Sequence, residues 1–216
     1  MLGEVELFKE LPGSVTAALV GGGRLHRLVR GDRLLHEGDA ADELFVVLDG
    51  EVAVSTRAPD GRESIVAVLS NGALLGELAL FDAAPRSADA RAVSDAEVLS
   101  VPYTPMRDAL TGFPPALWGV VGLLAARLRA ADDALADAAF LDVPGRTAKR
   151  LLELAGDAEE FSSPLTQEEL AGRVGASRER VNRALSTFVR LGWIELVERG
   201  RYRILDRRAL EQRSAR

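Results

Sequence analysis

The chain has no cysteine among its 216 residues and only two histidines. The absence of cysteine excludes disulfides, zinc sites with thiolate ligands, iron–sulfur clusters and thiol nucleophiles. The two histidines, His26 and His36, stand among charged residues without the spacing of metal ligands. We therefore interpret them as ordinary surface or half-buried side chains, and the sequence predicts no metal site.

Long apolar runs are also missing. No run of about 18 apolar residues offers a membrane span. The first six residues, MLGEVE, carry acidic side chains where a secretion signal would carry basic ones. With 47% hydrophobic and 28% charged residues, the composition is typical of a globular protein of one or two domains. We expect a cytoplasmic protein without a membrane partner.

Enzyme motifs are absent as well. The sequence contains no G-x-x-x-x-G-K-[ST], G-x-S-x-G or H-E-x-x-H pattern. Two isolated histidines in a chain without cysteine do not form the ligand set that metal-assisted hydrolysis requires. These absences argue against an enzyme and for a binding or regulatory protein.

Charge is distributed unevenly along the chain. Residues 1–141 hold 12 basic and 21 acidic side chains, a net charge of −9, whereas residues 142–216 hold 15 and 12, a net charge of +3. Nearly all basic residues are arginine, with Lys9 and Lys149 the exceptions. An arginine-rich carboxyl-terminal part suits the recognition of phosphates and bases.

The region from Leu28 to Tyr103 has the pattern of a β-sandwich or barrel. Short apolar runs alternate with turn signals about every ten residues. Asp49-Gly50 and Asp60-Gly61 predict tight hairpins, because glycine accepts the positive φ that such turns require.

A long helix is predicted next, starting near Pro114 and Pro115. Its apolar seam, at alternating spacings of four and three, consists of Leu117, Val121, Leu124, Leu128, Ala131, Leu135 and Ala138. Three unbroken heptads favour a parallel pair of helices in a dimer; the alternative is a helix packed on its own domain. The stretch from Asp142 to Arg146 interrupts the pattern and is a candidate hinge. We expect a helix over 147–155 and a polar loop over 156–164.

Residues 165–191 have the pattern of a helix-turn-helix. Thr166 and Glu169 form a capping box, Gly175 marks the turn, and Ser177 is placed to cap a second helix. A small hairpin is predicted after it, as in a winged helix-turn-helix. The alternative is a structural helical hairpin whose charges are only solvated.

Base-reading side chains stand on the outward face of the second helix. Arg178 and Arg183 can each place two donors on a guanine, and Glu179 can accept from a cytosine amine. The amino-terminal turn of a recognition helix is the part that enters the major groove. Arg201, in the hairpin, is placed to contact phosphates.

Three motifs now indicate a family. The stretches GELALFDAAPRSADARA, AAFLDVPGR and LTQEELAGRVGASRERVNRAL occur in this order, and nearly the whole chain resembles the cyclic-AMP receptor protein (Crp/Fnr) family of bacterial transcription regulators. The resemblance implies an α+β fold. Its parts are a cyclic-nucleotide-binding β-roll (a jelly-roll-like double-stranded β-helix) over 1–112, a long dimerisation helix and hinge over 113–141, and a winged helix-turn-helix over 142–216.

The resemblance also implies a ligand site. Gly76 and Glu77, followed by Leu78, would meet the ribose 2′-hydroxyl of a cyclic nucleotide, and Arg86 and Ser87 its phosphate. The chemistry agrees, because a guanidinium neutralises a phosphate and a carboxylate accepts from a hydroxyl. Cyclic AMP is the expected ligand.

The positions that hold the base in cyclic-AMP-binding members match Ala131 and Asp132, which differ from the family's polar pair. Ala131 offers no hydrogen bond. Asp132 accepts only, from adenine N6 or from guanine N1 and N2; the alternative is a solvated side chain. Cyclic GMP, or no ligand, therefore stays open.

The resemblance finally implies a homodimer on double-stranded DNA, with RNA polymerase as a further partner. The predicted DNA-binding residues are Thr166, Ser177, Arg178, Glu179, Arg183 and Arg201. The expected site is a palindrome close to TGTGA-N6-TCACA. Two alternatives stay open: a member that binds DNA without a nucleotide, with Arg86 held by an internal acid, and a regulatory module that represses a protein partner.

Overall fold

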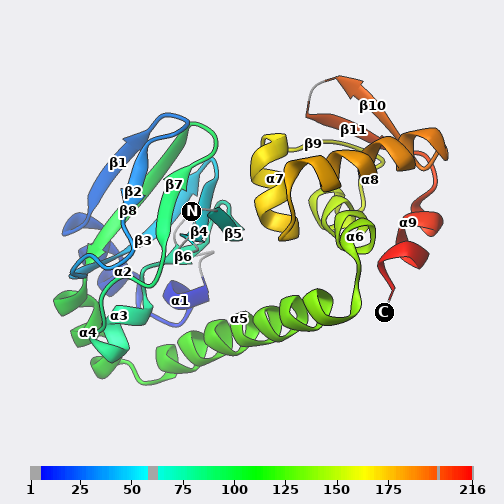
Figure 1. The fold of residues 1–216 in the computed structure, drawn as a ribbon. Coiled ribbons are helices and arrows are strands. Elements are labelled where there is room, and N and C mark those ends of the chain that lie inside the picture. Colours follow the sequence, from blue (N-terminus) through cyan, green and yellow to red (C-terminus); the bar gives the residue numbers. More distant parts are fainter. Residues whose placement is uncertain (1–5, 58–62, 199, 216) are drawn as a thin grey trace. The chain divides into compact units, whose positions relative to one another are not determined.

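The computed structural model describes residues 6–57, 63–198 and 200–215 of the chain (Figure 1). Two compact units are formed, Met1–Thr56 with Val66–Arg129 and Arg57–Ile65 with Ala130–Arg216. The elements in chain order are α1 (Glu6–Lys9), α2 (Gly13–Gly21), β1 (Arg24–Leu28), β2 (Arg33–Leu35), β3 (Glu43–Asp49), β4 (Val52–Arg57), β5 (Glu63–Leu69), β6 (Leu74–Leu75), α3 (Leu78–Asp82), β7 (Asp89–Ala92), β8 (Ala96–Pro102), α4 (Tyr103–Gly112), α5 (Pro115–Phe140), α6 (Val143–Ala155), β9 (Glu160–Ser162), α7 (Gln167–Val174), α8 (Arg178–Arg190), β10 (Ile194–Glu198), β11 (Arg201–Ile204) and α9 (Arg207–Ser214).

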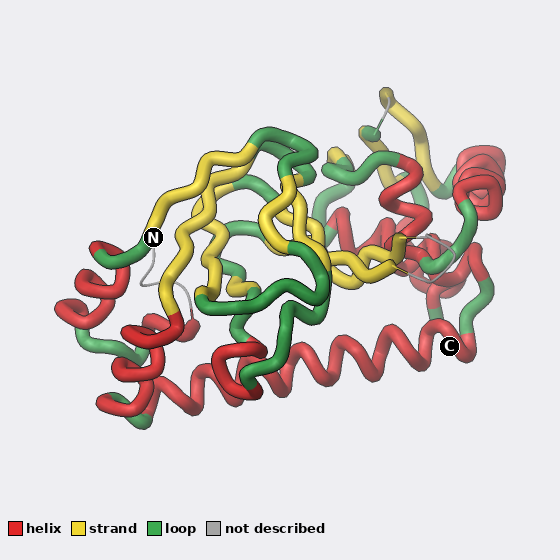
Figure 2. The backbone as a smooth tube through the Cα atoms, turned by 60° about the vertical axis from the view of Figure 1, so that its left-hand side comes forward, coloured by secondary structure: helices red, strands yellow, loops and turns green. Residues whose placement is uncertain are grey.

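Two four-stranded sheets form the β-roll in the amino-terminal part of the chain. Their strand orders are β1-β8-β3-β6 and β2-β7-β4-β5, and the strands are drawn in yellow in Figure 2. Strand pairs such as β3 with β8 and β4 with β7 are antiparallel. The predicted β-roll within an α+β fold is confirmed.

Strand β3 is covered on both faces. Phe45 and Val47 belong to a buried cluster that also holds Val52 and Ala90 of the other sheet. Leu44 and Val46, on the opposite face of β3, belong to a second buried cluster together with residues of α2, α4 and α5. Successive side chains of a strand point to opposite faces, so an apolar run without alternation is what a doubly covered strand requires.

The hairpin predicted at Asp49-Gly50 is wrong. Strand β3 lies in one sheet and β4 in the other, so this turn carries the chain between sheets. Gly50 has a φ of +75°, and a Cβ there would lie 2.1 Å from the Asp95 carbonyl oxygen. Glycine is required by this close approach rather than by a hairpin. The predicted turn at Asp60-Gly61 lies outside the described residues.

Helix α5 confirms the predicted long helix. Its Ala116 and Val120 are buried in the cluster with α4. Most of the predicted seam is exposed: Leu128 is 63% and Leu135 70% accessible. In the described part of the chain no single helix meets the length and apolarity of a membrane span; α4 and α5 together do so by length and composition, with a bend of 116° between them.

The interruption after α5 is shorter than predicted. Only Leu141 and Asp142 separate α5 from α6, which begins at Val143 rather than at Thr147. Pro144 is accommodated in the first turn of α6, where its missing N–H is no loss. Pro144 and Gly145 are therefore part of a helix, and the candidate hinge reduces to two residues.

Asp142 begins α6. Its Oδ1 accepts from the Gly145 N–H at 2.9 Å, and its carboxylate pairs with Arg213 of α9 at 2.5 Å. Desolvation would raise the pKa of Asp142, but the Gly145 N–H and the Arg213 guanidinium outweigh it, so the pKa lies below its usual value. A lowered pKa stabilises the folded state above the unfolded pKa of about 3.9, and this contribution disappears as the pH falls through the folded pKa.

Asp142→Ala is expected to lower the free energy of unfolding by about 1 kcal/mol at pH 7, because a helix cap is lost. Urea unfolding measures the effect. Asp157→Ala, in an exposed loop, is the matched control. The difference between Asp142→Ala and wild type should narrow below about pH 4; an equal difference at pH 7 and pH 3 would contradict the assigned role.

The predicted helix-turn-helix is confirmed. Helix α7 carries the complete capping box: the Glu169 N–H donates to Thr166 Oγ1 at 3.2 Å, and the Thr166 N–H donates to Glu169 Oε2 at 2.6 Å. Gly175 ends α7 with a φ of +69°. Helix α8 then buries its inner face, namely Val181, Ala184, Leu185 and Phe188.

The wing contains one strand more than predicted. Strands β10 and β11 form the expected antiparallel hairpin, and β11 also pairs with β9. Strand β9 lies in the stretch that was predicted as a polar loop. Its Phe161 stacks on Tyr202 of β11, with ring centroids 5.7 Å apart. Strand β9 forms because it pairs with the distant strand β11, and the local sequence does not predict a strand there.

Candidate functional site

The segment from Gly76 to Ser87 joins β6 to β7 and contains α3. Gly76 has a φ of +76°, and α3 ends at Ala83 in the left-handed conformation. Arg86 is fixed through its backbone, because its N–H donates to the Asp39 carbonyl at 2.9 Å and its carbonyl accepts from the Gly38 N–H at 2.8 Å. The Arg86 end of the predicted ligand segment is thus held by backbone hydrogen bonds to the loop between β2 and β3.

Arg86 points inward and is only 7% exposed. Its guanidinium donates to the carbonyls of Glu43 at 2.7 Å and Gly76 at 3.2 Å, and to the Tyr103 hydroxyl at 3.0 Å. A Cβ on residue 76 would lie 2.4 Å from Arg86 Nη1. Gly76 therefore leaves room for the guanidinium, which brings the two ends of the segment together.

Tyr103 completes this arrangement. Burial raises the pKa of the Tyr103 phenol above its ordinary value, although the nearby Arg86 opposes the shift. The phenol is thus neutral at physiological pH, and it donates to the Gly76 carbonyl while it accepts from Arg86. The charge of Arg86 is solvated by dipoles, and no carboxylate of the described residues pairs with it. The internal acid of the alternative hypothesis is absent from these contacts.

Glu77 is the most buried acid of the segment, at 1% exposure. Its Oε1 pairs with Arg127 of α5, which also donates to the Leu74 carbonyl. Its Oε2 is buried and has no hydrogen-bond partner among the described residues. An unsatisfied buried acceptor costs about 1–3 kcal/mol, so this oxygen is suited to accept from a ligand hydroxyl.

The other predicted ligand residues are accessible. Leu78, the first residue of α3, and Ser87, in the loop before β7, are exposed. Ala131 and Asp132 lie beyond Arg127 on α5, and their side chains are also exposed. The structure thus brings Gly76 and Arg86 into contact and buries the neighbouring Glu77. The ligand roles of all these residues stay predictions.

Sequence reasoning missed Arg127 and Tyr103. Arg127 was not singled out in the sequence, and Tyr103 was named only as the end of the β region. One signal was present: an acid within an apolar segment is rarely buried without a cation. The choice among arginines still depended on the tertiary fold. Within the described residues, no cluster of three or more His, Cys, Asp or Glu side chains could hold a metal.

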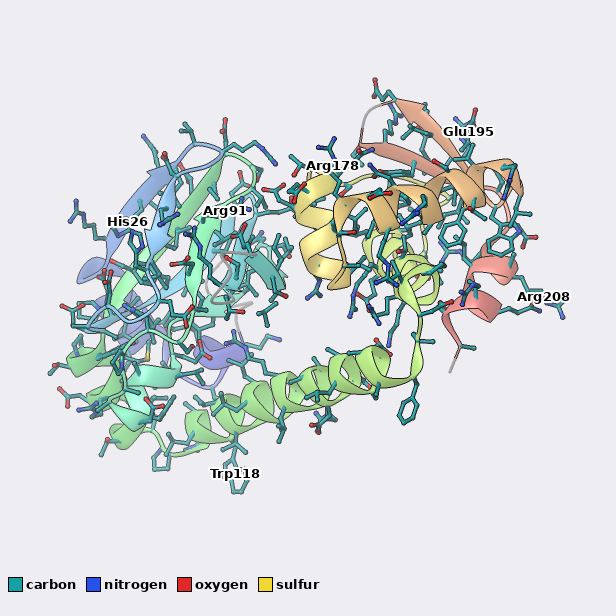
Figure 3. All side chains as sticks on the ribbon, viewed as in Figure 1. His26, Arg91, Trp118, Arg178, Glu195 and Arg208 are labelled. Carbon is teal, nitrogen blue, oxygen red and sulfur yellow. The ribbon has the colours of Figure 1, made fainter. Side chains whose placement is uncertain are left out.

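The second candidate site is the outer face of α8. Arg178, labelled in Figure 3, is exposed in the first turn of α8. Arg183 and Glu179 are also exposed and form a loose pair at 3.6 Å. Ser177 stands at the N-cap, but its side chain makes no capping hydrogen bond, which differs from the prediction. Its hydroxyl and these charges are available to a partner such as DNA.

Arg201 of the wing is paired instead. It contacts Glu160 of β9 and, at 3.4 Å, Glu198 of β10. Arg203 also pairs with Glu160, at 2.7 Å, and its hydrogen bond is the main reason why the pKa of Glu160 lies below its usual value. The acids of the wing therefore neutralise part of the charge that was expected to face phosphates.

Two domain families match parts of the chain. Residues 25–112 match the model of the cyclic nucleotide-binding domain, and residues 145–213 match that of the Crp-like helix-turn-helix domain. The first range includes the Gly76–Ser87 segment, and the second includes α7 and α8.

Two curated relatives are similar over most of the chain. The "CRP-like cAMP-activated global transcriptional regulator" of Mycobacterium tuberculosis is 37% identical over 203 residues, which is 91% of each chain. The "cAMP-activated global transcriptional regulator CRP" of Salmonella typhimurium is 34% identical over 168 residues, 74% of this chain and 80% of that one.

Solved structures show the same fold. FixK2 from Bradyrhizobium japonicum superposes with a TM-score of 0.82 at 21% identity, covering 90% of this chain and 98% of that chain. The catabolite activator protein of Thermus thermophilus gives a TM-score of 0.55 at 29% identity, covering 97% and 98%. The paired domains and the similarity to the curated relatives lead to one assignment: the chain belongs to the Crp/Fnr family of cyclic nucleotide-binding transcription regulators.

Proposed function

We propose that the protein is a homodimeric regulator that binds cyclic AMP at Glu77 and Arg86 and a TGTGA-like palindrome through α8. Ligand binding shifts a pre-existing equilibrium so that two recognition helices fit grooves one DNA turn apart. The observation that carries the proposal is the buried Glu77 oxygen without a partner among the described residues, on the same segment as the buried Arg86.

The ligand chemistry follows from these two side chains. A ribose hydroxyl would donate to Glu77 Oε2 and would satisfy it. Arg86 has five N–H donors and uses three hydrogen bonds within the protein. Its remaining donors and its positive charge are available to a cyclic phosphate, which carries one negative charge. The names of the curated relatives support cyclic AMP as the nucleotide.

The side chains at the base positions also fit a second nucleotide. Asp132 is exposed and accepts only, so it suits the paired N–H donors of guanine at least as well as adenine N6. Cyclic GMP is therefore the alternative ligand. The other alternative, a member that binds DNA without a nucleotide, predicts equal operator affinity with and without either compound.

The apolar seam of α5 supports a homodimer. The single chain leaves four apolar seam residues exposed, namely Leu117, Val121, Leu128 and Leu135. Burying a leucine of this seam in an interface would stabilise that interface by about 1.5–3 kcal/mol. A second copy of the same helix presents a complementary seam. DNA with two half-sites requires such a two-fold arrangement.

Fluorescence anisotropy tests the proposal. A labelled TGTGA-N6-TCACA duplex is titrated with the protein alone, with cyclic AMP and with cyclic GMP, and a duplex with scrambled half-sites serves as the control. We expect the intact palindrome to bind about tenfold more tightly or better when cyclic AMP is present, which corresponds to about 1.4 kcal/mol of coupling. Equal affinity under all three conditions would instead support the nucleotide-independent alternative.

A further inference from the structure

The DNA-binding unit contains a groove that neither candidate site uses. Its volume is about 450 Å³, and it lies between the start of α6, one side of α8 and the end of α9. Its apolar lining comes from Val143 and Pro144 of α6, Phe188 of α8, and Leu191 and Trp193, which follow α8. We call this the α6–α8 groove. Pockets of small ligands have similar volumes and mostly apolar walls.

Arginines give the groove a positive charge. Arg180, Arg183 and Arg213 all line it. Arg213 is neutralised by Asp142, and Arg183 has only the exposed 3.6 Å contact with Glu179. No carboxylate among the described residues pairs with Arg180. A ligand that complements this groove has an apolar body and one anionic group.

We propose that the α6–α8 groove binds a small amphipathic anion, a carboxylate or sulfonate on a hydrocarbon or aromatic body, and that this anion competes with DNA. The apolar body lies against Phe188, Leu191 and Trp193, and the anionic group meets Arg180. Competition follows because Arg183 both lines the groove and is proposed to read a base. The competition rests on the proposed DNA-binding function, whereas binding in the groove does not.

Decanoate is a suitable probe, and Trp193 reports its binding. The chain has two tryptophans, and the other one, Trp118, projects from α5 with 77% exposure (Figure 3). Trp118→Phe therefore leaves Trp193 as the single emitter. In this background, decanoate should change the Trp193 fluorescence with a saturable curve. Decanol, which lacks the charge, should bind about tenfold more weakly or not at all, the change expected from one lost charge-assisted hydrogen bond.

Variants separate the groove from non-specific binding. Arg180→Gln should weaken decanoate binding by about fivefold to tenfold, and Leu191→Glu, at a residue 52% exposed, should abolish it by repulsion. Arg190→Gln, on α8 but outside the groove, is the matched control and should bind as the parent does. If decanoate binding does not saturate, or if Arg180→Gln and Arg190→Gln bind decanoate with equal affinity, the proposed anion binding in the α6–α8 groove is wrong.

The DNA effect is measured separately. Saturating decanoate should weaken operator binding in the parent protein but not in Leu191→Glu. If decanoate binds but operator affinity is unchanged, the proposed competition between the anion and DNA is wrong. If the operator is not bound even without decanoate, the proposed function fails while the fluorescence result on the groove still stands; if the operator is bound but decanoate is not, the groove alone fails.

Discussion

Replacing Leu128 and Leu135 together by aspartate is expected to make the protein monomeric and to weaken operator binding by at least about 100-fold. Both leucines are exposed in the single chain, at 63% and 70%, so their replacement leaves the core of either unit unchanged. In a dimer, four leucines of about 1.5–3 kcal/mol each would be lost from the interface. A monomer engages only one half-site at a time, which removes the gain from linked binding.

Sedimentation velocity measures the mass, and anisotropy measures operator affinity. Val29→Asp is the matched control, because Val29 is an exposed apolar residue outside α5. It should leave both readouts unchanged. A dimer that persists in the Leu128→Asp, Leu135→Asp double variant would show that the seam is not the interface.

Arg178→Ala is expected to weaken binding to the intact palindrome by about 1–3 kcal/mol and to remove the preference for guanine at one position of each half-site. The reason is geometric, because one arginine offers two parallel donors that match guanine O6 and N7. Arg178 is exposed in the first turn of α8, so its loss removes no buried contact. Affinities for a set of operators with single substitutions measure the effect.

Arg201→Ala is the matched comparison for this series. Arg201 is proposed to contact phosphate, and its pairs with Glu160 and Glu198 already compensate part of its charge. Its loss should weaken all operators equally and by less than the loss of Arg178, with a slightly reduced salt dependence. If Arg178→Ala leaves the relative affinities of the substituted operators unchanged, α8 does not read bases through this residue.

Local signals in the sequence were sufficient to predict the helix-turn-helix and the long helix. The capping box of Thr166 and Glu169 and the glycine at position 175 specify the helix-turn-helix by chemistry within a few residues. The apolar spacing of α5 likewise predicted a helix of the observed length. These features depend on neighbours in the sequence, which is why they could be predicted.

Features that depend on distant partners were predicted less well. The turn at Asp49-Gly50 connects two sheets because β3 pairs with β8 and β4 pairs with β7. Strand β9 exists through its pairing with β11. In the ligand segment, Glu77 and Arg86 were predicted, but Arg127 and Tyr103 reach them only through the packing of α5 and α4.

Calorimetric titration of cyclic AMP into the wild-type protein, Glu77→Gln and Arg86→Ala tests the central claim most directly. Glu97→Gln, a half-buried acid paired with Arg27 on β1, is the matched control. We expect saturable heat in the wild type and in the control, and a loss of affinity of at least about tenfold in the other two variants, since each loses a charge-assisted hydrogen bond to the nucleotide. No heat with cyclic AMP or cyclic GMP, or equal affinity in all four proteins, would contradict a nucleotide site at Glu77 and Arg86.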